Sequence, residues 1–166
     1  MINISLNKNF VAIVDDDYAH LADNKWTVYE SSKTSYATRI NYLGDNKKEK
    51  LYLHRVIMNA PKGVIVDHIN GDGLDNRKEN LRFATKSENL CNRSRTNGRI
   101  YDLPKGVTMD KRKKVKKYIV QVCFGGKCQY RAYFETVGEA EEAYIEKSAK
   151  IQKDFSYHTS RNTSPK

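Results

Sequence analysis

The longest apolar runs in this 166-residue chain, such as Phe10–Val14, are only four or five residues long. A membrane-spanning helix needs about 20 predominantly apolar residues in a row, so these runs predict no membrane span. Apolar residues make up 39% of the sequence, which is too little for one large core. We therefore expect two small cores, in one domain or two small ones.

The chain is basic, with 30 Lys and Arg against 20 Asp and Glu and a net charge of +10. The excess is uneven, because residues 101–166 carry +6 and the longer segment 1–100 carries only +4. Most of it comes from residues 111–117, where six of seven side chains are basic, directly before the strand-like run Tyr118–Phe124. This arrangement predicts a basic cluster, held against a sheet, that contacts a polyanion.

Three cysteines, Cys91, Cys123 and Cys128, are too few and too scattered for a disulfide framework and form no C-x-x-C pair. The amino-terminal residues lack the basic and apolar regions of a secretory signal. Secreted, membrane and zinc-finger classes are thus not expected. We expect an intracellular, cytoplasmic protein whose polyanionic partner is nucleic acid.

The first 60 residues read as short strands separated by turns. Strands are expected at Phe10–Val14, Lys25–Tyr29 and Tyr36–Ile40, and helical spacing of apolar residues predicts a helix over Leu51–Met58. Asp15–Asp17 are expected to form a turn and a helix cap, since three consecutive side chains cannot easily face one metal ion.

Residues 64–95 carry the pattern with most chemical content. A strand ending in Asp67-His68 is followed by a loop, a second strand from Asn80, and a helix opened by the capping box Thr85–Glu88. Hydrolysis of a phosphodiester needs a base and an ion that neutralises charge in the transition state. Histidine is suited to act as that base near neutral pH. Carboxylate and amide oxygens favour Mg²⁺ or Mn²⁺, and no zinc is expected.

This stretch resembles the HNH endonuclease family, and most closely its homing-type branch. The resemblance rests on Val66–Asp72, Leu74–Arg77 and Asn80–Arg82, with further similarity in Lys25-Trp26, Tyr36–Arg39 and Leu53–Arg55. It covers most of residues 10–95.

The resemblance implies a ββα-metal nuclease fold in which His68 is the general base and Asn80 orients it. It also implies that Asp67 and Asn89 hold one divalent ion. Many family members have His where this chain has Asn89, and Asn92 lies one helical turn further on, so either amide remains a candidate. Arginines surround the motif and either grip phosphates or solvate the surface: Arg77, Arg82, Arg93 and Arg95. For His54 we expect a structural or phosphate-contact role.

Residues 105–157 predict a second unit. Strands are expected at Gly106–Met109, Lys117–Phe124 and Gln129–Phe134, with Gly125-Gly126 as a two-residue hairpin turn. A capping box at Thr136–Glu139 opens a helix. Continuous pairing from the turn would place Gln121 opposite Tyr130 and Cys123 opposite Cys128, all on one face.

This order of elements resembles the APETALA/ethylene-response-factor DNA-binding domain, which lays a three-stranded sheet in the major groove. The resemblance implies that the face carrying Gln121 reads DNA. Two positions that commonly hold arginine are here Cys123 and Cys128, which we expect to be free thiols. The base-edge candidates are Gln121 and Tyr130. The phosphate-contact candidates are Lys105, Arg112, Lys113, Lys116 and Lys117.

The sequence thus predicts an α+β protein with a nuclease domain, residues 1–95, whose β-rich part is 1–60 and whose ββα-metal motif is 62–95. A linker 96–104, a DNA-binding domain 105–157 and a flexible tail 158–166 follow. The expected function is metal-dependent cleavage of double-stranded DNA by a monomer or homodimer, with no membrane or protein partner. The alternatives are a non-catalytic DNA-binding repressor with a decayed nuclease module, and a protein that binds or cuts RNA.

Overall fold

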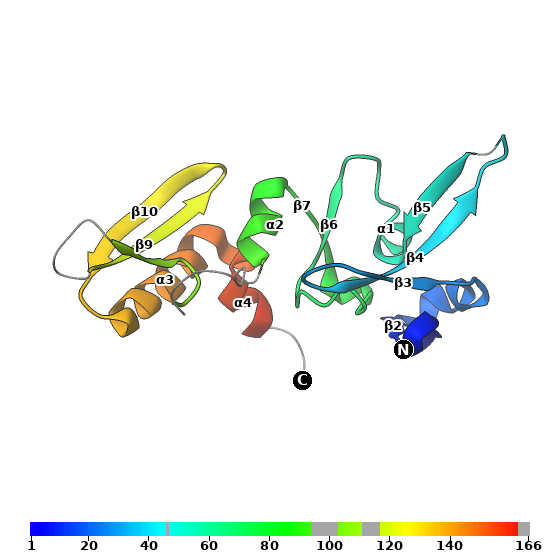
Figure 1. The fold of residues 1–166 in the computed structure, drawn as a ribbon, viewed down its shortest axis with the longest axis horizontal. Coiled ribbons are helices and arrows are strands. Elements are labelled where there is room, and N and C mark those ends of the chain that lie inside the picture. The colour runs from blue at the N-terminus through cyan, green and yellow to red at the C-terminus, as the bar shows by residue number, and fades with distance from the viewer. Residues whose placement is uncertain (46, 94–102, 111–116, 163–166) are drawn as a thin grey trace. The chain divides into compact units, whose positions relative to one another are not determined.

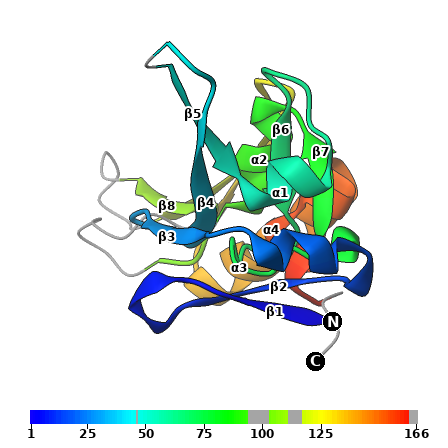
Figure 2. The same ribbon diagram turned by 90° about the vertical axis from the view of Figure 1, so that its right-hand side faces the viewer.

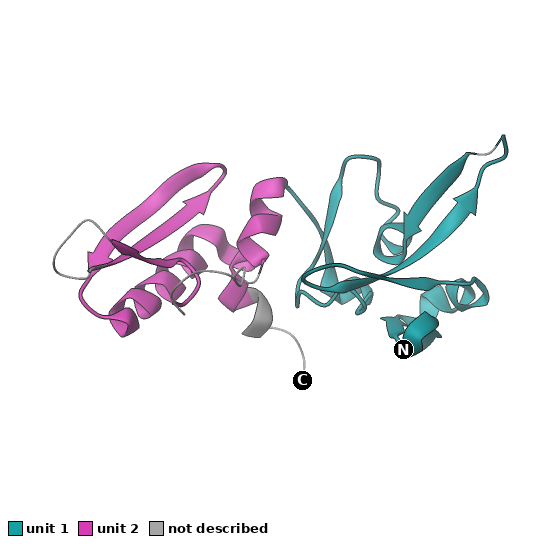
Figure 3. Cartoon of the chain, in the orientation of Figure 1, with its two compact units in different colours: residues 1–85 teal, residues 86–166 magenta. Residues whose placement is uncertain are grey.

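A computed structural model describes residues 1–45, 47–93, 103–110 and 117–162 (Figure 1). The chain forms two compact units, residues 1–85 and 86–166 (Figure 3), and each is described by itself. None of the helices in the described ranges is long and apolar enough to cross a membrane.

The first unit consists of three small antiparallel sheets joined by short helices (Figure 2). The sheets are β1 (Ile2–Ser5) with β2 (Val11–Val14), β3 (Thr27–Glu30) with β4 (Ser35–Tyr42) and β5 (Lys48–Tyr52), and β6 (Ile65–His68) with β7 (Leu81–Ala84). The helices are η1 (Asn7–Asn9), η2 (Asp16–Asp23), α1 (Leu53–Ile57) and η3 (Lys78–Asn80).

One small core joins these sheets. Alternation along the strands turns Ala12 and Val14 of β2 and Ala37 of β4 inward, where Trp26 and Leu53 meet them. The Trp26 indole N–H donates to the carbonyl of Leu21 over 2.8 Å, so its polar group is satisfied within the core. The core therefore fixes β4 and α1, the two elements that precede the candidate site.

The helix expected over Leu51–Met58 is shorter in the structure. Residues Lys48–Tyr52 form β5, whose Leu51 pairs with Arg39 and whose Tyr52 pairs with Thr38. The helical spacing of apolar residues corresponds to a helix only within α1. The preceding residues Leu51 and Tyr52 are extended because β5 forms ladder hydrogen bonds with β4. Asp16–Asp23 form the short helix η2, so the aspartates stand at a helix start as expected. The expected side-chain cap is not formed, because the N-cap residue Asp15 makes no capping hydrogen bond and accepts the Lys78 N–H over 2.7 Å.

The second unit backs a three-stranded antiparallel sheet with a helix. Its strands are β8 (Val107–Asp110), β9 (Lys117–Phe124) and β10 (Lys127–Phe134), in the order β10-β9-β8. Its helices are α2 (Lys86–Asn92), α3 (Val137–Gln152), η4 (Lys153–Phe155) and α4 (Tyr157–Asn162). The predicted capping box of α3 is confirmed, since Thr136 accepts from the Glu139 N–H and Glu139 accepts from the Thr136 N–H.

Two features of the second unit differ from the sequence-based expectation. Helix α4 covers Tyr157–Asn162, where a flexible tail from residue 158 was expected. Helix α2, expected to complete the nuclease domain, contacts β9, η4 and α4 and belongs to the second unit. Because β6 and β7 lie in the first unit, the ββα-metal arrangement stays a prediction.

Gly106 shows how closely α3 packs on this sheet. Its φ is +78°, and a Cβ built on it would lie 2.0 Å from the ring of Tyr144, which is buried on α3. Only glycine both adopts this backbone conformation without strain and leaves room for the ring.

We expect Gly106→Ala to destabilise the second unit. The left-handed conformation costs about 1–2 kcal/mol for a residue with a Cβ, and forcing extra atoms into a packed site adds about 1–3 kcal/mol. The matched control is Gly125→Ala, which has φ +61° but open space around the new Cβ and should lose only the backbone contribution. Urea denaturation of both variants checks this, and an equal loss in the two would contradict the packing argument.

Candidate active site

His68 ends strand β6 and is buried, with 6% of its surface exposed. The β6–β7 ladder pairs His68 with Leu81 and Asp67 with Arg82. Successive strand residues point to opposite faces, so His68 and Val66 face the core side while Asp67 leaves the strand on the other side. The strand thereby fixes the direction of the imidazole.

Asn76 sets the protonation pattern of the His68 ring. The side-chain oxygen Oδ1 of Asn76 lies 3.4 Å from Nε2 of His68, and Nδ2 of Asn76 donates to the Leu74 carbonyl over 2.8 Å. Because that amide group donates to a carbonyl, its oxygen must be the atom that faces His68. Nε2 of His68 therefore carries the hydrogen, and Nδ1 is the nitrogen with the lone pair.

His68 is a neutral imidazole at neutral pH. Burial lowers its pKa from the ordinary value of 6.5, and the hydrogen bond to Asn76 and the charges of Asp67, Asp72 and Asp75 only partly oppose this effect. A neutral imidazole accepts a proton, which is the property that a general base needs.

The ring of His68 also belongs to a cluster of aromatic side chains from β4, β5 and α1. The His54 ring packs edge-on against it with 4.9 Å between centroids, and the Tyr36 ring lies 5.9 Å away. Tyr52 lies 5.5 Å from His54 and 6.1 Å from Tyr36. His54 had been expected only to have a structural or phosphate-contact role, and it forms one wall of the His68 site.

Nδ1 of His54 is buried and has no hydrogen-bond partner among the described residues. Burial, and then the neighbouring His68 and Arg55, lower the pKa of His54 from 6.5 to about 3. A second neutral imidazole thus stands against the candidate base.

Asp67 forms an ion pair with Arg82 across the ladder. Nε and Nη2 of Arg82 donate to Oδ2 of Asp67 over 3.0 and 2.8 Å, and both side chains are largely buried. Arg82 is therefore committed to a carboxylate in this structure. Among the described residues, no three or more His, Cys, Asp or Glu gather closely enough to hold a metal ion.

Mg²⁺ is commonly held by one or two carboxylates together with water and substrate phosphates, not by a complete protein cage. Carboxylate and amide oxygens are the kind of donors that it prefers. Asp67 lies in the first unit. Asn89 and Asn92 lie on α2 in the second unit, where Asn89 is half-buried and Asn92 is buried. The role of all three as ligands stays a prediction.

Asn80 organises the chain that follows His68. Its Nδ2 donates to Oδ1 of Asn70 and to the Asp75 carbonyl over 3.0 and 2.8 Å, and its Oδ1 accepts the Asn70 N–H over 2.9 Å. Its own carbonyl accepts the N–H of Ile69 over 2.8 Å. Asn80 was expected to orient His68 by a hydrogen bond near it. Three of these four bonds go to Ile69 and Asn70, the two residues directly after His68, and the fourth goes to Asp75.

Arg77 is bound within the loop. Its Nε and Nη2 donate to the two carboxylate oxygens of Asp75, each over 2.8 Å, and its Nη1 donates to Glu79 over 2.6 Å. These bonds lower the pKa of Asp75 and raise that of Arg77. The alternatives for Arg77 were phosphate contact and surface solvation, and its present partners are carboxylates of its own loop.

In the second unit a β-bulge between Cys128 and Tyr130 changes the predicted hairpin register. Cys128 does pair with Cys123, but Tyr130 pairs with Val122 and Arg131 with Gln121. The extra residue in the bulge turns Tyr130 to the core face, where it packs against the hydrophobic cluster. The predicted pairing of Tyr130 with Gln121 on one face is therefore wrong, and Arg131 takes the place beside Gln121.

The remaining predicted contacts fall in different parts of the chain. Nζ of Lys105 donates to the carbonyls of Cys91 and Arg93 and lies 4.6 Å from the ring of Tyr157. Arg93 is exposed at the end of α2, and the three cysteines are free. Arg95, Arg112, Lys113, Lys116 and the side chain of Lys117 lie outside the described residues.

A family model described as HNH endonuclease matches residues 51–91. The matched segment runs from β5 through α1, the β6–β7 hairpin and the start of the second unit, and it contains His54, His68 and Asn80. The match supports a nuclease acting on nucleic acid. No curated protein and no solved structure matches the chain.

The two buried histidines predict that stability falls in mild acid. In the unfolded chain His54 binds a proton near pH 6.5, whereas in the folded chain it does so only near pH 3. Between these values the unfolded state binds more protons, so the free energy of unfolding falls by up to about 1.4 kcal/mol per pH unit for this group.

We expect His54→Phe, which keeps an aromatic ring, to lose less unfolding free energy than wild type between about pH 6.5 and pH 4. Chemical denaturation across that range measures the difference. The same pH slope in both proteins would show that His54 is not held neutral in the folded state.

Proposed function

We propose that this protein is a metal-dependent endonuclease of the HNH type that hydrolyses phosphodiester bonds in double-stranded DNA. The observation that carries the proposal is the buried His68 at the end of β6, whose Nε2 lies 3.4 Å from Oδ1 of Asn76. Burial lowers the pKa of His68, which favours the neutral imidazole. The match over residues 51–91 supports the same reaction class.

In this mechanism, Nδ1 of His68 takes a proton from the attacking water. Asn76 holds the ring in the tautomer that leaves Nδ1 basic, and His54 and Tyr36 fix the plane of the ring. Asp67 with Asn89 or Asn92 would hold Mg²⁺ or Mn²⁺, which neutralises charge that develops on the phosphate when bound. Asn80 keeps residues 69 and 70 in place beside the base.

We further propose that the second unit helps to address the enzyme to DNA. A sheet backed by α3 is the order of elements expected from the resemblance to the APETALA/ethylene-response-factor domain, and its open face carries Gln121 and Arg131. A homing role and the number of strands cut belong to this proposal as expectations from the resemblance.

His68→Ala should abolish cleavage and leave DNA binding intact. Without the imidazole no group at the site takes the proton from water, and the loss should reach at least the 10²–10⁴-fold typical of a general base. The measurement is nicking of supercoiled plasmid with Mg²⁺ and with EDTA, together with a gel-shift assay. Full activity in the variant would exclude His68 as the base. An inactive wild type that still binds DNA would favour a repressor, and preferential competition by RNA would favour an RNA substrate.

Asn76→Ala should lower the cleavage rate by about tenfold or more while DNA affinity stays the same, because the ring of His68 loses the partner that selects its tautomer. Removal of the partner that fixes a catalytic tautomer costs up to about 10⁴-fold in serine proteases. Asn76 is fully buried, so thermal unfolding must first show that the variant is folded. A folded variant with wild-type single-turnover rates would contradict the assigned role.

A further inference from the structure

One face of the β3–β4–β5 sheet carries tyrosines and lysines and no acidic residue. The ladders pair Tyr29 with Tyr36, Ile40 with Lys50 and Tyr42 with Lys48. Paired residues share a face, and residues two apart along a strand share it too. The tyrosine–lysine face is made of Tyr29, Tyr36, Ile40, Tyr42, Lys48, Lys50 and Tyr52, together with Thr27 and the buried Thr38.

The reverse face of the same sheet is different in kind. It packs Val28 and Ala37 against the core of the first unit, and its outer parts carry the carboxylates of Glu30 and Glu49. The acidic side chains of the three strands thus all lie on the reverse face, which also carries Arg39 over the ring of Trp26. A polyanion would meet no carboxylate on the tyrosine–lysine face.

The two lysines of this face are positioned by rings and not by carboxylates. Nζ of Lys50 lies 3.4 Å from the centroid of Tyr29 and 5.2 Å from that of Tyr52, and Nζ of Lys48 lies 5.3 Å from that of Tyr42. Neither lysine forms a salt bridge within the described ranges. A cation–π contact is worth about 0.5–1 kcal/mol at an exposed site, which orients each ammonium group and leaves its charge available.

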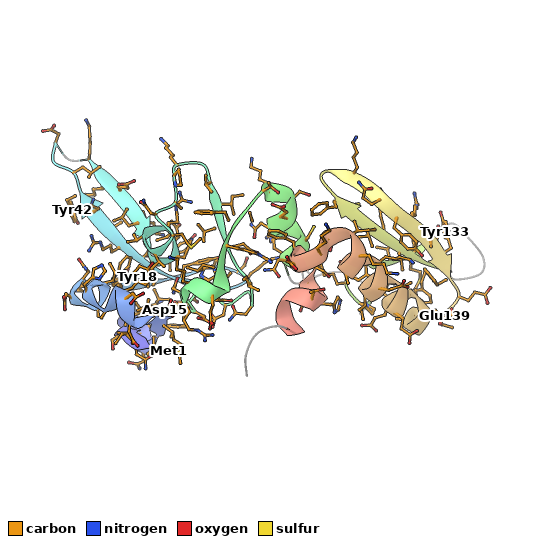
Figure 4. The ribbon with its side chains drawn as sticks, turned by 180° about the vertical axis from the view of Figure 1, so that it is seen from behind. Met1, Asp15, Tyr18, Tyr42, Tyr133 and Glu139 are labelled. Atoms are coloured by element: carbon orange, nitrogen blue, oxygen red, sulfur yellow. The ribbon has the colours of Figure 1, made fainter. Side chains whose placement is uncertain are left out.

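The face is exposed at its outer end and continuous with the candidate active site. Tyr42, near the outer end of the hairpin, is 71% exposed (Figure 4). Toward His68, the ring centroids of Tyr29 and Tyr52 are 6.4 Å apart and those of Tyr52 and Tyr36 are 6.1 Å apart. The centroids of Tyr36 and His68 are 5.9 Å apart. The rings therefore form a chain of contacts from the open sheet to the candidate base.

The dimensions suit a nucleic-acid strand. From Tyr36 to Tyr42 the strand β4 advances roughly 20 Å at about 3.4 Å per residue. One helical turn of B-DNA is about 34–36 Å long, so the face is long enough to follow a duplex backbone over part of a turn.

We propose that the tyrosine–lysine face binds the sugar–phosphate backbone of duplex DNA on one side of the bond that is cut. Lys48 and Lys50 would each contact a phosphate. The inference rests on the proposed nuclease function and adds a binding surface in the first unit to the basic surface expected in the second. The two lysines argue against a protein partner, because lysine is depleted at the core of protein interfaces.

The test uses the full chain carrying His68→Ala, so that binding is measured without cleavage. The probe is a fluorescein-labelled duplex of mixed sequence, titrated over a series of salt concentrations. Each lost phosphate contact should reduce the magnitude of the slope of log K against log salt by about 0.9. We expect Lys48→Gln with Lys50→Gln to reduce it by about 1.8 and to weaken binding about tenfold at low salt.

Two matched controls remove charge elsewhere in the first unit. Lys8→Gln removes the positive charge of a lysine that pairs with Glu30 over 2.6 Å. Glu49→Gln removes a negative charge from the reverse face of β5. Both should keep the parent slope. Replacement of Tyr42 by the photocrosslinker benzoylphenylalanine should give a DNA adduct, whereas the same replacement at exposed Val11 on β2 should not.

The proposal is overturned if the double lysine variant keeps the parent slope, if Lys8→Gln changes it equally, or if the parent does not bind the duplex. Plasmid nicking by wild type is scored separately. A reduced slope in the double variant with no nicking by wild type would leave the binding surface standing and remove the nuclease. Normal nicking by wild type with an unchanged slope in the double variant would remove the binding surface and leave the nuclease proposal standing.

Discussion

The buried carboxylate of Asp75 holds the loop between β6 and β7 in one shape. It accepts two hydrogen bonds from the guanidinium of Arg77, one from the Arg77 backbone N–H and one from Asn70, while its backbone carbonyl accepts from Asn80. Removing one partner of such a buried pair leaves an uncompensated charge, which is far more costly than a missing surface contact. The loop is therefore fixed by a connected polar network, although it contains no regular secondary structure beyond η3.

This network determines the chemistry because it is also tied to the core. The residues around Asp75 bond to β2, with the Ile13 N–H donating to Leu74 and the Asn76 N–H donating to Ile13 over 2.9 and 2.8 Å. Asn76 is thereby buried at a fixed point, and its amide oxygen faces His68. Burial accounts for both the Asp75–Arg77 ion pair and the neutral His68. A buried carboxylate requires a partner such as Arg77, and burial disfavours the charged form of His68.

The sequence predicted the parts of the site that depend on local order. Asp67-His68 at a strand end and the turn at Gly125-Gly126 follow from alternation and turn chemistry, and the structure confirms them. The return strand predicted from Asn80 begins one residue later, at Leu81, because Asn80 ends η3. The contacts of His68 with His54 and Asn76 could not be read in this way, because they depend on how α1 and the loop fold around β6. Asn76 stood within the motif that resembles the HNH family, which was the available signal.

The register error in the second unit has a different origin. Pairing from a two-residue turn is regular only until a bulge, and the β-bulge after Cys128 shifts it by one residue. The alternation of Tyr130, Ala132 and Phe134 with Arg131 was the available signal for the observed register. One inserted residue exchanges the two faces of β10 from that point on. Tyr130 consequently packs inward and Arg131 outward, so that a single local irregularity decides which side chains this sheet offers to a ligand.

The low apolar content explains why both units present open sheet faces. With 39% apolar residues, the chain covers one face of each larger sheet, by the core at Ala37 in the first unit and by α3 in the second. The uncovered faces must then be polar to stay soluble, and in both units they combine tyrosine with basic residues: Tyr42 beside Lys48, and Tyr133 with Arg131 at 5.8 Å. Sheets that need only one buried face thus leave the other available for a charged, extended ligand. The net charge of +10 is therefore best understood together with the sheets that carry part of it, because a charge is useful for positioning a phosphate only where the backbone beneath it is rigid.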